Sequence, residues 1–270
     1  MKKVLIAMCV YHTEENDRLP IIVRTLLALS TCLKPNHRLF IYDNSPNSII
    51  TDLRYHIEVV WSGKADNITF LGGDGINIGT ARGINECWKH HEEGEYLMKV
   101  DDDYLVKSIS YINEMVEVME RTPNLGILAL KRKDLTESPN HESIDYRTKL
   151  MMVPQKKGER WYVIEQVKNV FGTVQMYSPE LFKRIGYMEQ VGPYGWDDFI
   201  MSVKCYAAGM IGAFLPHVEI DHIDEGEEKY VEWKREQAAK VHDEVMHLAK
   251  QYKLGLKELY YDGGFKEQGT

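Results

Sequence analysis

Apolar and polar positions change period repeatedly along the first 130 residues. An apolar run at residues 4–10 is followed by a leucine and isoleucine stripe at helical spacing over residues 17–33. The pattern continues with a strand at 39–42, short strands at 57–61 and 68–71, a helix carrying Ala81, Ile84 and Trp88, a buried strand from Tyr96 to Val100, and a helix marked by Ile109 and Met119. This alternation predicts an α/β fold with a mostly parallel central sheet flanked by helices.

The second half of the chain is less regular. Residues 131–160 are polar and contain two prolines, which indicates loops and a β-hairpin placed over the site. Strand character returns at 167–177, a helix starts at Ser178-Pro179 and another at Asp197, and strand pieces at 211–215 and 218–220 end at Asp221-His222. A charged amphipathic helix after Glu225 is expected to pack back on the domain, with an oligomer contact as the alternative.

Three consecutive carboxylates, Asp101, Asp102 and Asp103, follow the buried strand. Like charges repel and are costly to desolvate, so a cation or solvent must compensate them. Because residues i and i+2 share one side of a strand, Asp101 and Asp103 can converge on one ion while Asp102 points elsewhere. Oxygen ligands of this kind suit Mg²⁺, Mn²⁺ or Ca²⁺. The alternative interpretation is a solvated acidic turn.

Composition narrows the class of protein. The chain of 270 residues is 44% hydrophobic and 27% charged, as is usual for a globular domain. A formal charge of -8 argues against bulk nucleic-acid binding, and no apolar stretch is long enough to predict a transmembrane segment. The four cysteines are far apart and form no C-x-x-C pair, which favours a reducing compartment and a cytoplasmic location.

Several known nucleotide-binding and calcium-binding motifs are absent. Asp43 ends the second strand, where a dinucleotide-binding fold places its ribose-binding acid, but the loop after the first strand contains no glycine. No P-loop sequence occurs either. The aspartate triplet is followed by Tyr-Leu-Val, which does not fit an EF-hand.

The remaining motifs occur in the order found in one known family. They are Tyr11 after the first strand, Asp43 in I-Y-D-N-S, Asn77, Gly79 and Arg82 in N-I-G-T-A-R, Asp101 and Asp103, Asp197-Asp198 in G-W-D-D-F, and His222. In this order and spacing the chain resembles a family 2 glycosyltransferase of the GT-A fold. The resemblance implies one domain over residues 1–222, with a Rossmann-like nucleotide-sugar-binding half at 1–130 and an acceptor and catalytic half at 131–222, followed by a helical extension at 223–270.

The resemblance also implies a donor site at the strand ends. By the resemblance the donor would be a nucleotide sugar, UDP-linked, with Asp43 binding the base and Arg82 near the diphosphate. Asp103, assisted by Asp101, would hold Mn²⁺ or Mg²⁺, a Lewis-acid role. His222 is either a further ligand or a strand-end residue paired with Asp221. The positions Tyr11, Asn77 and Asp102 are assigned to donor binding.

The acidic pair supplies the second half of the implied chemistry. A carboxylate must take the proton of the acceptor hydroxyl as that oxygen attacks the anomeric carbon. The resemblance assigns this role to Asp198, with Asp197 in place of the usual Glu, and implies inversion. Which of the two acids is the base stays open, as does a role as helix caps. The alternative functions are a sugar nucleotidyltransferase and a non-catalytic carbohydrate- or nucleotide-binding domain.

Overall fold

A computed structural model describes residues 2–60, 67–132, 149–156, 160–192, 194–223 and 228–264. The strands are β1 (Val4–Val10), β2 (His37–Asp43), β3 (Ile68–Gly72), β4 (Tyr96–Val100), β5 (Tyr104–Val106), β6 (Leu125–Arg132), β7 (Lys149–Pro154), β8 (Trp161–Val167), β9 (Val174–Tyr177) and β10 (Ile211–His222). The helices are α1 (Leu19–Cys32), α2 (Ile50–Val60), α3 (Thr80–Trp88), α4 (Tyr111–Arg121), α6 (Pro179–Ile185), α7 (Asp197–Ala207), α8 (Glu228–Lys240) and α9 (His242–Lys253).

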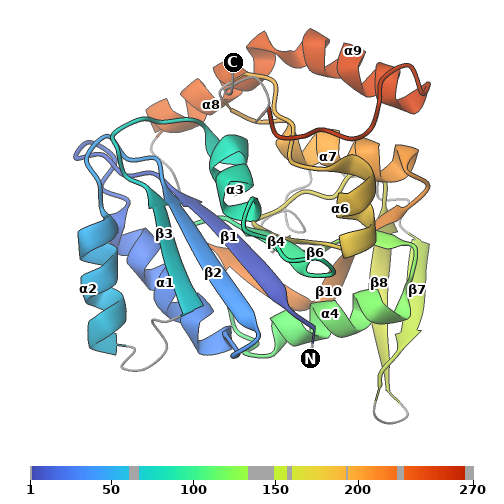
Figure 1. Ribbon diagram of the computed structural model, residues 1–270, viewed down its shortest axis with the longest axis horizontal. Coiled ribbons are helices and arrows are strands. Elements are labelled where there is room, and N and C mark those ends of the chain that lie inside the picture. Colours follow the sequence, from blue (N-terminus) through green and yellow to red (C-terminus); the bar gives the residue numbers. More distant parts are fainter. Residues whose placement is uncertain are drawn as a thin grey trace.

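Within the described ranges the strands form one sheet in the order β3-β2-β1-β4-β9-β6-β10-β8-β7, with β5 paired to β10. Figure 1 shows β3, β2, β1 and β4 in succession, with β8 and β7 at the opposite edge. Strands β3, β2, β1, β4, β6 and β10 run in one direction, whereas β9 and β8 run against them. The prediction of an α/β fold with a mostly parallel central sheet is confirmed. Parallel strands end at a common edge, so the residues after β1 and β4 lie together.

Helices cover both faces of the sheet because its central strands are apolar on both sides. In β1, Val4, Ile6 and Met8 pack in one core with α1, α2 and α4, while Leu5 and Ala7 pack in a second core with α3, α6 and α7. Successive side chains along the strand therefore point into opposite helical layers. Because both faces of β1 are buried, its sequence is apolar at every position, and this continuous run is what predicted the strand.

The sequence assigned several segments incorrectly. The strand predicted over residues 167–177 is confined to Val174–Tyr177, because β8 already ends at Val167. Residues 57–61 were predicted as a strand, but α2 continues to Val60, and residue 61 lies outside the described residues. Ile49, Leu53 and Ile57 are buried at a spacing of four, which is a helical stripe. The single helix predicted after Glu225 is two helices, α8 and α9, that meet at Val241.

The prediction of a hairpin in residues 131–160 is only partly correct. Strands β7 and β8 form an antiparallel hairpin at the edge of the sheet, but only β7 lies in that segment, and β8 follows it at Trp161–Val167. Residues 133–148 of the same segment lie outside the described residues. All four cysteines are free. Among the described helices, none combines the length and apolarity that a bilayer crossing requires.

The C-terminal helices pack on α7. Val245, Leu248 and Tyr252 of α9 form a small core with Ile200 and Val203 of α7, and Figure 1 shows α9 lying beside that helix. The predicted packing of the extension on the domain is therefore seen at α9. This arrangement fixes the position of α7, whose first turn carries the acidic pair.

Lys204 of α7 is a buried cation under these helices. Its side chain is 0% exposed, its Nζ has no hydrogen-bond partner, and Glu189 Oε2 is 3.7 Å away. Burial lowers the pKa of Lys204 to about 8. Glu189 also accepts hydrogen bonds from Tyr252 and from Lys257, so it stays paired without Lys204.

We expect Lys204→Met to stabilise the protein at neutral pH. A folded-state pKa of about 8 against 10.5 unfolded means that the charged form costs on the order of 3 kcal/mol below pH 8. The unfolded chain binds more protons between pH 8 and 10.5, so the parent gains stability over that range and the advantage of the variant shrinks. Urea unfolding at pH 7 and pH 9.5 measures this, with Lys253→Met at an exposed position of α9 as the control. An advantage equal at both pH values would contradict the assignment.

Candidate active site

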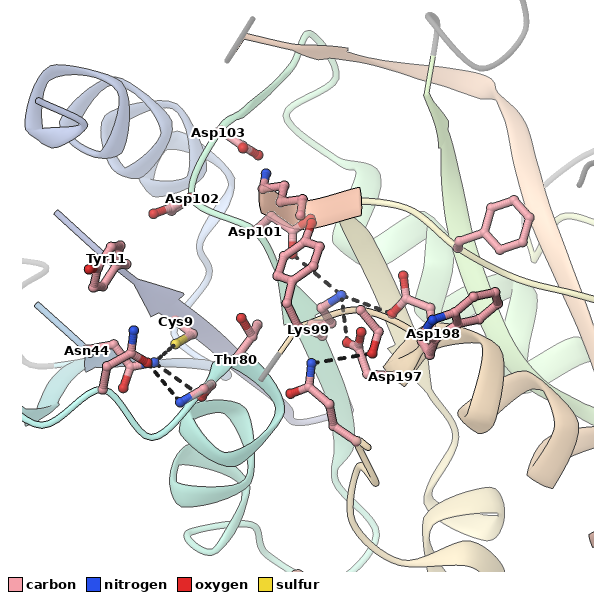
Figure 2. Close-up of a pocket in the computed structure, with 18 of the residues that line it drawn as sticks. Cys9, Tyr11, Asn44, Thr80, Lys99, Asp101, Asp102, Asp103, Asp197 and Asp198 are labelled. Carbon is pink, nitrogen blue, oxygen red and sulfur yellow. Dashed lines mark hydrogen bonds and ion pairs between the residues drawn. The ribbon is translucent and has the colours of Figure 1, made fainter. Parts of the chain in front are cut away.

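A cleft of about 1060 Å³ opens at the edge of the sheet where β1 and β4 end. It is lined by residues that follow these strands, by the start of α3, by the first turn of α7 and by part of α8. Figure 2 shows Tyr11, Asn44 and Thr80 on one side, the aspartate triplet above, and Asp198 on the other side. The topology thus brings residues from distant parts of the chain to one cavity.

Arg18 neutralises two of the three consecutive aspartates. Its Nη2 lies 2.7 Å from Asp102 Oδ1 and 3.0 Å from Asp103 Oδ2, and all three side chains are buried. Burial raises the pKa of Asp102 to about 6. Burial acts in the same sense on Asp103, but its hydrogen bond to His222 and the charge of Arg18 outweigh burial and lower the pKa of Asp103 to about 2. The two neighbours therefore differ in how firmly they hold a negative charge.

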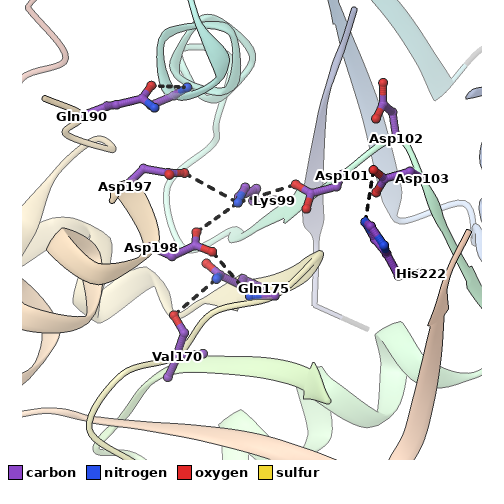
Figure 3. A network of polar contacts seen from close by, with 12 residues as sticks. Lys99, Asp101, Asp102, Asp103, Val170, Gln175, Gln190, Asp197, Asp198 and His222 are labelled. Carbon is purple, nitrogen blue, oxygen red and sulfur yellow. Dashed lines mark hydrogen bonds and ion pairs between the residues drawn. The ribbon is translucent and has the colours of Figure 1, made fainter. Parts of the chain in front are cut away.

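Lys99 neutralises the other carboxylates. Its Nζ lies 3.0 Å from Asp198 Oδ1, 3.5 Å from Asp101 Oδ1 and 3.6 Å from Asp197 Oδ2 (Figure 3). Burial opposes the charge on Lys99, but these carboxylates raise its pKa well above the usual range. Burial raises the pKa of Asp101 to about 6 and that of Asp198 to about 7, against the pull of Lys99.

The acidic pair sits in the first turn of α7, where carboxylates interact favourably with the helix dipole. The preceding residue, Trp196, has φ of 65°, a left-handed conformation that is costly for a bulky side chain. Its Nε1 donates a hydrogen bond to the Ala238 carbonyl oxygen in α8 at 2.8 Å. A contact from the C-terminal extension therefore supports the turn that aims Asp197 and Asp198.

Seven of the residues assigned from the sequence line this one cleft: Tyr11, Asn77, Asp101, Asp102, Asp103, Asp197 and Asp198. His222 lies just behind them, with its Nε2 3.3 Å from Asp103 Oδ2, so its partner is Asp103 and not Asp221. The arrangement places a carboxylate triplet and an acidic pair within one cavity, with Lys99 between them.

Two predicted donor-binding residues are not in the cleft lining. Asp43 is 1% exposed, and its carboxylate accepts hydrogen bonds from Ser45 N, Ser48 Oγ and Ile49 N, each at 2.9 Å. Its neighbour Asn44 faces the cleft instead. Arg82 lies on an exposed position of α3 away from the lining. Asp43 thus shapes the loop that presents Asn44.

Two cations of the cleft were missed in the sequence. Lys99 carried a signal, because a lysine inside the apolar strand Y-L-M-K-V is costly to bury unless carboxylates surround it. Arg18 carried none, since it lies in a polar stretch before α1 and reaches the triplet only through the fold. The prediction that a cation compensates the triplet therefore agrees with the structure, but the side chains of Arg18 and Lys99, which supply positive charge there, were not predicted.

The carboxylates of the cleft have features both against and in favour of a divalent metal site. In the parts of the chain that the structure describes, no group of three or more His, Cys, Asp or Glu is arranged to hold an ion. However, Asp103 Oδ1 is buried without a hydrogen-bond partner, and the Asp101 side chain is 33% exposed in the cleft. Mg²⁺-type ions commonly take one or two protein carboxylates and complete their shell with phosphates and water. Asp101 and Asp103 fit such an ion.

Comparison with known proteins finds similarity in structure only. No protein-family model and no curated protein sequence matches the chain. Among solved structures, GalNAc-T7 with UDP, GalNAc and Mn²⁺ matches with a TM-score of 0.59 at 12% identity, over 83% of this chain and 44% of that one. The mannosyltransferase PcManGT from Pyrobaculum calidifontis with GDP-Man and Mn²⁺ matches with 0.61 at 14% identity, over 93% and 69%. S. aureus TarS 1–349 also matches with 0.61 at 14% identity, over 93% and 65%.

These likenesses establish the fold. The chain spans 44% to 69% of the length of these three structures and shares their α/β architecture, the GT-A fold. The resemblance drawn from the sequence motifs is confirmed at this level.

Proposed function

We propose that this GT-A domain is a metal-dependent glycosyltransferase that moves a sugar from a nucleoside diphosphate sugar, UDP-linked, to an acceptor hydroxyl with inversion. One observation carries the proposal: Asp101 and Asp103 line the same cleft as Asp198, on the far side of Lys99. Two of the similar structures hold Mn²⁺ with UDP or a GDP-sugar, which supports a nucleotide-sugar ligand for this fold.

The donor is proposed to lie over the ends of β1 and β4. Asp101 and Asp103 would hold Mn²⁺ or Mg²⁺, and the bound ion would offset the negative charge of a departing diphosphate. Tyr11, Asn44 and Asn77 line the adjoining part of the cleft and are proposed to contact the nucleotide. Arg18 keeps Asp102 and Asp103 ionised and oriented, so that Asp103 presents its free Oδ1.

Asp198 is proposed as the general base. Its carboxylate would accept the proton of the acceptor hydroxyl as that oxygen bonds to the anomeric carbon and the bond to the diphosphate breaks. Attack from the side opposite the leaving group inverts the anomeric centre. A pKa of about 7 suits this role, because a base works best when its pKa is near the working pH.

A donor panel tests the function. Thermal unfolding is followed with UDP-glucose, UDP-galactose, UDP-N-acetylglucosamine and GDP-mannose, each with and without MnCl₂, and release of nucleoside diphosphate is then measured. We expect one donor to raise Tm only with Mn²⁺, and to be hydrolysed slowly when water replaces the acceptor. Binding without release would favour the non-catalytic alternative. Pyrophosphate formation from a nucleoside triphosphate and a sugar phosphate would favour the nucleotidyltransferase.

Activity is expected to rise as pH increases through about 7. Below this pH Asp198 carries a proton and cannot accept another, since burial raises its pKa to about 7. The charged groups that face it are Lys99, Asp197 and Asp101. The measurement is kcat/KM for diphosphate release from pH 5 to pH 9 at fixed Mn²⁺. A profile flat across pH 6 to 8 would remove Asp198 as the base.

A further inference from the structure

Lys99 joins the two chemical halves of the cleft. Its ammonium contacts carboxylates from two separate segments, Asp101 after β4 and the pair Asp197 and Asp198 at the start of α7 (Figure 3). The first segment is proposed to hold the donor, and the second to activate the acceptor. Among the described ion pairs, Lys99 is the cation that spans this gap.

The position of the Lys99 ammonium is fixed by the fold. Lys99 lies on β4 in the middle of the sheet, paired with Ala7 of β1 and Gln175 of β9. The residue is 5% exposed, so its side chain has little freedom. Because β4 is hydrogen-bonded to a strand on each side, the backbone that carries the ammonium is held by the sheet and not by a surface loop.

The contacts of Lys99 are unequal. The shortest, at 3.0 Å, is a hydrogen bond to Asp198 Oδ1, whereas Asp101 and Asp197 lie at 3.5 Å and 3.6 Å. The other oxygen of Asp198 faces the Gly172 amide at 3.4 Å. Lys99 therefore constrains the direction of the Asp198 carboxylate.

We propose that Lys99 is a positioning residue that holds Asp198 at a set distance and angle from the donor-binding Asp101. The inference rests on the proposed function, since it assumes that Asp198 is the base. A misplacement of about 1 Å in a reacting group costs on the order of a hundredfold in rate. Lys99 does not touch the reacting atoms in this proposal; it acts through Asp198.

Lys99→Met tests the proposal by separating binding from chemistry. We expect the variant to bind UDP with MnCl₂ as tightly as the parent or more tightly, because a cation near Asp101 is removed. Hydrolysis of the donor found in the panel should fall about a hundredfold in kcat, with KM within threefold. Calorimetric titration and initial rates give the two numbers. A variant that lost UDP binding in proportion to kcat would show a structural role and overturn the proposal.

Chemical rescue gives a second readout that does not depend on the variant folding perfectly. In Lys99→Ala, ethylammonium should enter the cleft and restore a part of the lost rate with saturation, while uncharged ethanol should not. Lys131→Ala is the matched control, since Lys131 pairs with Glu165 outside the cleft lining. The proposal would be contradicted if ethylammonium failed to raise the rate of Lys99→Ala, or if it raised the rate of Lys131→Ala by the same factor. Failure of the proposed function is distinguished from these results, because the parent would then hydrolyse no donor.

Discussion

Asp198→Asn is expected to lower sugar transfer by about 10²- to 10⁴-fold, the usual contribution of a general base. The amide has nearly the same shape as the carboxylate but cannot accept the proton at neutral pH. Donor binding with Mn²⁺ should be unchanged, because the proposed metal ligands are Asp101 and Asp103. The loss should therefore appear in kcat and kcat/KM equally. The measurement is the initial rate of diphosphate release, with Kd for UDP measured alongside.

Asp197→Asn is the control for this prediction. Both carboxylates lie in the first turn of α7 and both contact Lys99, so the two variants remove the same charge from the same place. We expect the Asp197 variant to retain at least a tenth of the parental rate. If the order of the two variants were reversed, the base would be Asp197. If both retained full activity, the proposed mechanism would be wrong.

Asp103→Asn is expected to abolish the Mn²⁺-dependent increase in Tm caused by UDP, and with it donor hydrolysis. Asp103 Oδ1 is the buried oxygen without a hydrogen-bond partner, and replacing it by an amide removes the negative charge on which a divalent ion depends. Thermal unfolding with UDP is measured over a Mn²⁺ titration. Asp102→Asn is the control, because both side chains pair with Arg18. An equal effect of both variants would contradict the assignment of Asp103 as the metal ligand, and would point instead to the shared contact with Arg18 or to donor binding by Asp102.

The same Asp103 substitution should cost roughly 2 kcal/mol of stability in the absence of metal. A folded-state pKa of about 2, against 3.8 unfolded, means that the ionised form is favoured by the fold. This contribution is complete above about pH 4 and is lost as pH falls toward 2. Urea unfolding of both proteins at pH 7 in EDTA measures the difference. A variant as stable as the parent would show that Asp103 is not held by Arg18 and His222 as described.

The periodicity of the sequence was sufficient to predict most of the fold. Strands β1 and β4 were identified because both of their faces are apolar, and α1 because its leucines recur at helical spacing. The segment 57–61 failed because a short apolar run has no length from which to tell a strand from the end of a helix. The break at Val241 carried no glycine or proline, so the pattern of α8 and α9 read as one helix.

The candidate site was predicted where chemistry depends on position along a strand. The triplet and the acidic pair converge because they follow β4 and begin α7 at one edge of the sheet. Asp43 is different, because its carboxylate accepts hydrogen bonds from backbone amides of its own loop. The identity of the residue does not reveal this local structure. The cations Lys99 and Arg18 could be assigned to partners only once distant segments were placed together.

The hydrogen bond between Trp196 and Ala238 has a consequence for shortened versions of this protein. All described strands lie at or before β10, so a chain truncated there would retain its two larger cores but lose the small core between α7 and α9. It would nevertheless lose the carbonyl that receives the indole proton, and the unfavourable turn before the two acids would then lack its external support. Deletion of α8 and α9 should therefore yield a protein with a folded circular dichroism spectrum but a lower kcat.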